Sequence, residues 1–202
     1  MKEISNYFKV GVISIIIFAF EILGGIMSGS LALLADSGHV LIDLFAIGIS
    51  IMSVYLVNKH KKNEIRKYGG YVNAGLLVII AFWIFGDAYI RLKSEIHIES
   101  PVMIFVAFLG GVGNYFQHYI MVRNKNHNVT HRILSIHVLS DLLQSIGVVI
   151  GGIIIYTTGV QIIDIIISVV IGSLMLWWGV RIMWQLYLGH EFHSCHEHEH
   201  HH

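Results

Sequence analysis

Several apolar stretches of roughly the length needed to cross a membrane constrain the fold of this chain more than any other feature of its sequence. About 20 apolar residues in a helix span the hydrocarbon core of a bilayer. Of the 202 residues, 55% are hydrophobic and 13% are charged, whereas soluble domains carry about 25% charged residues. The stretches 75–85 and 162–180 show almost none of the polar spacing that gives a soluble helix its solvated face. The sequence therefore predicts an integral membrane protein.

Polar and glycine-containing breaks divide the chain into six predicted transmembrane helices, at residues 7–28, 31–57, 70–92, 101–122, 131–157 and 161–187. The tight turn Ser28-Gly29-Ser30 separates the first two helices, and the charged run 58–67 is expected to form the longest polar loop. The predicted fold is thus an all-α membrane domain over residues 1–188. Residues 189–202 form a histidine-rich tail, which is either a purification tag or a native metal-binding segment.

The distribution of positive charge predicts the orientation of these helices. With six crossings, 11 of the 13 lysine and arginine residues fall on one side of the membrane, and only Arg91 and Lys93 fall on the other. Because cytoplasmic loops carry the excess of Lys and Arg, both termini are expected in the cytoplasm. In a bacterium the protein would lie in the inner membrane. Basic and acidic residues balance at 13 each, which argues against a nucleic-acid-binding protein.

One motif occurs twice among the ionisable residues of the predicted helices. The second helix contains His39-Val-Leu-Ile-Asp43, and the fifth contains His137-Val-Leu-Ser-Asp141. A spacing of four residues places both side chains of each pair on one helix face, a turn apart. Ionisable residues inside a membrane cost about 2.5–3.5 kcal/mol each on insertion scales and therefore mark functional sites. His39 and Asp43 lie roughly 14–20 Å from the outer face, near the depth at which transporters bind substrates.

If these two helix faces oppose each other, they bring together two imidazoles and two carboxylates. Four nitrogen and oxygen ligands suit tetrahedral Zn²⁺, and two carboxylates neutralise a dication. Without the metal, carboxylates so deep in the membrane favour protons, so metal and protons are expected to compete. The predicted ligands are His39, Asp43, His137 and Asp141, with no resident cofactor and no enzymatic reaction. A haem held by facing histidines is the alternative from another class, although haem makes no use of the aspartates.

Longer segments around these pairs resemble the cation diffusion facilitator family of zinc transporters. Residues 28–43, Ser-Gly-Ser-Leu-Ala-Leu-Leu-Ala-Asp-Ser-Gly-His-Val-Leu-Ile-Asp, are similar to the family's signature in its second helix. Residues 137–147, His-Val-Leu-Ser-Asp-Leu-Leu-Gln-Ser-Ile-Gly, are similar to the signature of its fifth helix. Glu21-Ile-Leu-Gly-Gly25 is similar to the first helix, and Asp164 lies where the family often has Asp-Pro, here Asp164-Ile165.

The resemblance implies a homodimeric transporter that exchanges cytoplasmic Zn²⁺ for protons by alternating between inward-open and outward-open forms. It also implies the same four metal ligands, and paired His-Asp motifs resemble the zinc-selective branch. Co²⁺, Cd²⁺, Fe²⁺ and Ni²⁺ stay alternative cargoes, because affinity alone does not decide selectivity. Family members usually continue into a cytoplasmic domain that binds metal and dimerises. The sequence here ends soon after the sixth predicted helix, so we expect it to be either a truncated piece of a longer protein or a family member without that domain.

Five further ionisable residues in the predicted helices are interpreted one by one. Glu21 either takes part in an intramembrane proton or polar network or pairs with a neighbouring helix. Asp36 is expected to stabilise the start of the second helix rather than to support the metal ligands. Asp87 and Asp164 are expected at solvated helix ends, and His118 is expected to be a hydrogen-bonded histidine of the core.

Overall fold

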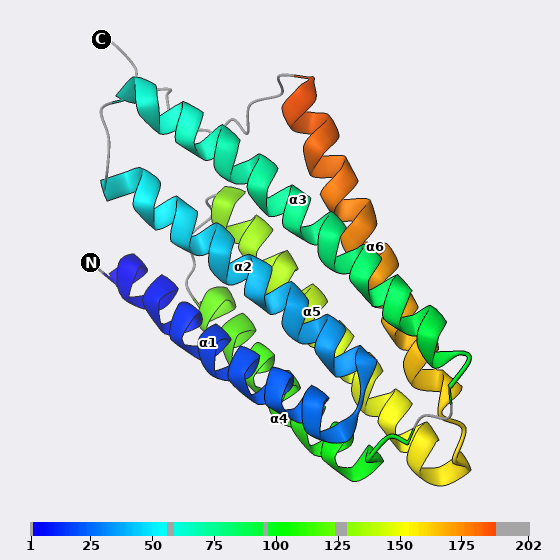
Figure 1. The fold of residues 1–202 in the computed structure, drawn as a ribbon. Helices are drawn as coiled ribbons and strands as arrows, with labels where there is room; N and C mark the ends of the chain where they lie inside the picture. The colour runs from blue at the N-terminus through cyan, green and yellow to red at the C-terminus, as the bar shows by residue number, and fades with distance from the viewer. Residues whose placement is uncertain (1, 56–58, 95–96, 124–128, 189–202) are drawn as a thin grey trace.

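A computed structural model describes residues 2–55, 59–94, 97–123 and 129–188, and leaves the side chains of 2–9, 46–55, 59–67, 121–123 and 129–138 outside its description. The described residues form helices and no strand. The six helices are α1 Lys2–Ser28, α2 Leu31–Tyr55, α3 Lys59–Arg91, α4 Ser100–Arg123, α5 Val129–Thr158 and α6 Ile162–Tyr187 (Figure 1). The predicted all-α fold of six helices is confirmed.

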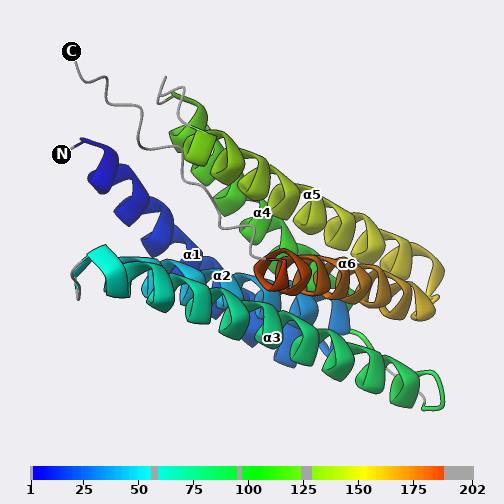
Figure 2. The same ribbon diagram turned by 90° about the horizontal axis from the view of Figure 1, so that it is seen from above.

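Consecutive helices run antiparallel, so the start of α1 and the end of α6 lie at the same end of the bundle (Figure 1). The most extensive contacts pair α4 with α5 and α3 with α6, and α1 packs on both α2 and α4. Helices α1, α4 and α5 thus form one group, and α3 and α6 form the other. α2 links the two groups, since it contacts α1 as well as α3 and α6. Seen from above, α5 and α3 lie on opposite sides of the bundle with α6 between them (Figure 2). The even number of helices agrees with the predicted topology, while the cytoplasmic side stays a prediction.

The predicted start of α3 is clearly wrong. The charged run 58–67, expected as a loop, is helical from Lys59 onward, and α3 is 33 residues long. Lysine, glutamate and arginine have high helix propensities, so the helix continues past its apolar part. At 1.5 Å per residue α3 is about 50 Å long, which exceeds the roughly 30 Å hydrocarbon core. α1 also starts early, at Lys2 instead of residue 7.

Large apolar side chains cover the outside of the bundle. Ile79, Phe116 and Val170, on three different helices, are 64%, 53% and 54% exposed. Lipid chains solvate such a surface at little cost, whereas water does not. Four described segments are long and apolar enough to cross a membrane, namely Val10–Ser28, Tyr68–Arg91, Leu139–Thr158 and Ile162–Tyr187. The exposed apolar faces and these long apolar segments together identify a multi-pass membrane domain.

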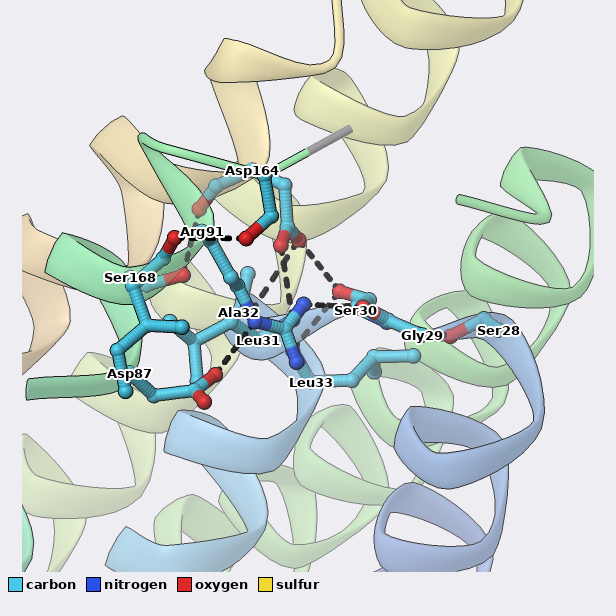
Figure 3. Close-up of polar contacts among 12 residues, drawn as sticks. Ser28, Gly29, Ser30, Leu31, Ala32, Leu33, Asp87, Arg91, Asp164 and Ser168 are labelled. Carbon is cyan, nitrogen blue, oxygen red and sulfur yellow. Dashed lines mark hydrogen bonds and ion pairs between the residues drawn. The ribbon is translucent and has the colours of Figure 1, made fainter. Parts of the chain in front are cut away.

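The first turn of α2 is held by a side chain from the other end of the chain (Figure 3). Asp164, in the first turn of α6, is fully buried and accepts hydrogen bonds from Leu31 N–H at 2.8 Å, Ala32 N–H at 3.2 Å and the Ser30 hydroxyl at 2.5 Å. Ser30 Oγ in turn accepts the N–H of Leu33 at 3.2 Å. A helix start leaves its first N–H groups without acceptors, and here all of the first three receive one. α2 is thereby fixed to α6 in axial position and in rotation.

The turn before α2 is held as well. Gly29 has a φ of +70°, in the left-handed region that glycine adopts without strain. Its carbonyl oxygen accepts a hydrogen bond from Arg91, which also pairs with Asp87 one turn earlier in α3 (Figure 3). The carbonyl oxygen of Ser28 accepts the N–H of Glu99 at 2.9 Å. Backbone and side-chain bonds therefore join α1, α2, α3 and α6 at one end of the bundle.

Candidate metal site

The ligand atoms of three ionisable residues converge inside the bundle between α2 and α5. His39 and Asp43 lie one turn apart in α2, and Asp141 lies in α5. His39 Nε2 lies 3.7 Å from Asp43 Oδ2 and 3.5 Å from Asp141 Oδ1. One ligand atom from each residue lies within 4.8 Å of the others. The side chains of His39, Asp43 and Asp141 are only 12%, 25% and 9% exposed, so the protein supplies most of the surroundings of this cluster.

These separations suit ligands that share one ion. Zinc bonds of about 2.0 Å in tetrahedral geometry place neighbouring ligand atoms about 3.3 Å apart. The two separations at His39 Nε2, 3.7 and 3.5 Å, are close to that value. They exceed the roughly 2.7–2.9 Å of a charge-assisted hydrogen bond. The cluster therefore has the dimensions of a cage for a small cation, and small side-chain movements would bring the ligands into bonding range.

The predicted fourth ligand, His137, lies in α5 one turn before Asp141. Its side chain lies outside the described residues, so its place in the ligand set stays a prediction. The same holds for the histidine-rich tail 189–202, which is likewise outside the described part of the chain. Three of the four predicted ligands are thus brought together by the fold, from the two helices that carry the repeated motif.

The depth of the cluster follows from its place in α2. His39 and Asp43 come eight and twelve residues after Leu31, the first residue of that helix. At 1.5 Å per residue they lie roughly 12 and 18 Å from the N-terminal end of α2. This is about half the thickness of the hydrocarbon core. This position along α2 agrees with the predicted depth, which stays a prediction, and the bonds to Asp164 fix where α2 begins.

Asp36 does not have the role that the sequence predicted. The start of α2 is bonded to Asp164 and Ser30 instead, and Asp36 lies in the second turn with 1% of its surface exposed. Its carboxyl group lies within reach of Ser145 on α5. It is also close enough to the three clustered residues to act on them electrostatically. Asp36 therefore belongs to the surroundings of the cluster formed by His39, Asp43 and Asp141.

Two neutral residues that sequence reasoning did not single out connect α4 to the cluster. Asn114 Nδ2 donates to Ser145 Oγ at 3.1 Å, and Ser145 Oγ donates to the carbonyl oxygen of Asp141 at 3.2 Å. Both side chains are buried, at 3% and 0% exposed. A search limited to ionisable groups could not find them, although an amide inside an apolar helix is itself a signal. This chain of bonds fixes α5 against α4 next to Asp141.

The remaining predictions for single residues have mixed outcomes. Asp164 was expected at a solvated helix end, which is wrong, because it is buried as the acceptor for the α2 start. Asp87, near the end of α3, is 30% exposed and paired with Arg91. His118 was expected to be hydrogen-bonded, but its buried Nδ1 has no partner among the described residues. Glu21 is completely buried and lies against α4.

Comparisons with known proteins agree with this architecture. Residues 8–188 match the model of the cation efflux transmembrane domain. The chain is 38% identical over 184 residues to zinc transporter ZitB of Yersinia pestis, covering 86% of this chain and 57% of that protein. It is 36% identical over 164 residues to metal cation efflux system protein CzcD of Cupriavidus metallidurans, covering 77% and 52%. It is also 28% identical over 172 residues to the cadmium, cobalt and zinc/H⁺-K⁺ antiporter of Bacillus subtilis, covering 80% and 55%. The chain thus spans little more than half the length of these relatives.

Proposed function

The chain belongs to the cation efflux family, the cation diffusion facilitators, and we propose that it carries Zn²⁺ out of the cytoplasm in exchange for protons. The single observation that carries this proposal is the convergence of His39 Nε2 with carboxylate oxygens of Asp43 and Asp141 inside a membrane domain. Relatives named as zinc transporters support zinc as the cargo. The Bacillus relative is named for exchange with H⁺ and K⁺, which supports a cationic counter-ion.

In the proposed cycle, Zn²⁺ enters from the cytoplasm and is bound by the imidazole of His39 and the carboxylates of Asp43 and Asp141, with His137 as the fourth ligand. Metal ligands must be deprotonated, so binding releases whatever protons these groups hold. Two carboxylates balance the charge of the dication, which lowers the cost of holding it in the membrane. The helices then reorient, and protons from the outside displace the metal from the same atoms.

Charge movement makes the proton stoichiometry important. Export of one Zn²⁺ against entry of two protons moves no net charge across the membrane. Exchange for a single proton would move one positive charge outward, and an inside-negative potential of 100 mV opposes that by about 2.3 kcal/mol. Measuring proton flux per zinc at different membrane potentials therefore separates the two schemes.

The proposal is tested by zinc transport into liposomes that contain the purified protein, with dyes for zinc and pH on opposite sides. Asp43→Asn or Asp141→Asn removes one charge and one strong ligand, so uptake is expected to fall to that of protein-free liposomes. Glu99→Gln is the matched control, because this carboxylate is outside the cluster and its side chain is 57% exposed. Wild-type zinc uptake in both aspartate variants, with helical content unchanged, would refute the assignment.

The same liposomes decide between the cargoes. Co²⁺, Cd²⁺, Fe²⁺ and Ni²⁺ compete with zinc for nitrogen and oxygen ligands, and geometry rather than affinity order decides selectivity. A metal that drives faster proton exchange than zinc at equal concentration would replace zinc as the proposed cargo. The haem alternative is tested by the visible spectrum of the purified protein, since bound haem gives a Soret band. A homodimer is proposed by analogy with the family, and light scattering of the detergent-solubilised protein measures it directly.

A further inference from the structure

Glu21 is a buried ionisable group that the proposed zinc cycle does not use. It lies about two turns before the end of α1 and has no exposed surface. Neither of its carboxyl oxygens has a hydrogen-bond partner among the described residues. The carboxyl group lies directly against α4 at Gly110, since a Cβ atom added to that glycine would overlap Glu21 Oε1. Glycine at position 110 therefore makes the space that this acid occupies.

The charged groups that face Glu21 from the surrounding helices are acidic. Asp36 on α2 and Asp141 on α5 lie within electrostatic range of its carboxyl group. Asp36 is itself 1% exposed, and its Oδ2 has no hydrogen-bond partner among the described residues. α4, which packs on α1, contributes the neutral Asn114 one turn after Gly110. The Asn114 amide donates to Ser145 instead, so among the described residues Glu21 has neither a counter-charge nor a hydrogen-bond partner.

An ionised carboxylate in this position would be buried without compensation, which proteins avoid by keeping such a group neutral. Acids placed in this way within membrane helices occur in proton relays. We propose that Glu21 holds a proton while the metal cluster is empty and releases it when a divalent metal binds to His39, Asp43 and Asp141. The O–H bond of the carboxylic acid breaks, its electron pair stays on the carboxylate, and water takes the proton.

The bound metal gives the physical reason for this release. It cancels the negative charge of Asp141 and adds positive charge close to Glu21, so that an ionised Glu21 gains a counter-charge that it otherwise lacks. Glu21 is then a proton site separate from the metal ligands. This inference rests on the proposed metal exchange and adds to it one titratable group. It predicts that zinc displaces about one proton more than the ligands alone release.

Counting protons tests this directly. Zinc is added to the detergent-solubilised protein in weak buffer, and proton release per bound zinc is measured with a pH indicator beside a calorimetric binding curve. Glu21→Gln keeps the size of the side chain but is permanently neutral, so it is expected to bind zinc and release about one proton fewer. Glu21→Asp keeps an acid and is expected to restore the count. Glu99→Gln, the exposed control, is expected to leave it unchanged.

Infrared difference spectroscopy of the wild type adds a readout that needs no variant. The carbonyl band of a protonated carboxylic acid is expected to be present without metal and to disappear on addition of zinc. Its absence from the metal-free protein would overturn the inference, even if Glu21→Gln did not fold. Equal proton release in wild type and Glu21→Gln, with zinc still bound, would overturn it while leaving the proposed function intact. Failure of the wild type to bind zinc would instead overturn both.

Discussion

Replacing Asp164 by asparagine removes one acceptor oxygen from the contact that fixes α2. In the wild type its two carboxylate oxygens accept three hydrogen bonds, at 2.5, 2.8 and 3.2 Å, from the Ser30 hydroxyl and the N–H groups of Leu31 and Ala32 (Figure 3). With the amide oxygen in place of Oδ1, the bonds from Ser30 and Ala32 survive. The amide nitrogen then takes the place of Oδ2 and points donor hydrogens at the N–H of Leu31. One bond is lost and two buried donors face each other.

The expected loss of stability follows from these contacts. A hydrogen bond to a charged group contributes about 1.5–3 kcal/mol, and a buried donor without an acceptor costs about 1–3 kcal/mol. Together with the loss of the negative charge at the start of α2, these two contributions lower the free energy of unfolding by about 3–5 kcal/mol. On the scale of globular domains of this size, about 2–4 °C per kcal/mol, the unfolding midpoint falls by roughly 6–20 °C. Asp164→Ala removes all three bonds, so its unfolding midpoint is expected to fall at least as far.

The assay is thermal unfolding of the detergent-solubilised protein, followed by tryptophan fluorescence and by the loss of monodisperse protein on gel filtration. Asp87→Asn is the matched control, since it makes the same chemical change at the same end of the bundle. The Asp87 side chain is 30% exposed in an ion pair within one helix, and partly exposed pairs contribute about 1 kcal/mol or less. If Asp164→Asn unfolded at the same temperature as Asp87→Asn, the proposed anchoring of α2 would be wrong.

Three further predictions concern the cluster and its surroundings. Asp141→Asn is expected to weaken zinc binding at least tenfold in calorimetry, because a charged ligand is replaced by a neutral one; unchanged affinity would exclude Asp141 as a ligand. Zinc at about 100 times its dissociation constant is expected to stabilise the wild type by about 2.7 kcal/mol and to leave Asp43→Asn nearly unaffected, measured as a shift of the unfolding midpoint. Gly110→Ala is expected to destabilise the domain by about 1–3 kcal/mol, since its Cβ overlaps the Glu21 carboxyl group; Gly75→Ala, which meets nothing within 4 Å, is the control.

The sequence alone predicted the parts of this structure that depend on local pattern. Helix lengths follow from apolar runs, and the His39-Asp43 pair follows from a spacing of four residues that any helix converts into one face. Convergence of this pair with Asp141 was predictable because the same motif occurs in two membrane helices, where isolated charges are costly. Local pattern failed at Lys59, where helix propensity alone extended α3 beyond the apolar segment.

Contacts between distant residues were not predictable in the same way. Asp164 bonds to the start of α2 across 133 residues of sequence, as counted to Leu31. An aspartate in the first turn of a helix ordinarily stabilises its own helix. The sequence position of Asp164 therefore suggested a solvated helix end rather than hydrogen bonds to the start of another helix. Likewise, the place of Glu21 against Gly110 depends on how closely α1 and α4 approach each other. Such contacts follow from the packing of whole helices, which one sequence does not specify.

The packing of α2 and α5 bears on the proposed transport cycle. α2 and α5, which carry the clustered His39, Asp43 and Asp141, contact each other far less than α4 contacts α5 or α1 contacts α2. Each is anchored elsewhere, α2 to α6 through Asp164 and α5 to α4 through Ser145 and Asn114. The distance between His39 and Asp141 is therefore set by two anchors rather than by direct packing. Because few contacts between α2 and α5 must be broken, we expect the two helices to separate and close at small cost, and in the proposed cycle a bound cation would link them directly.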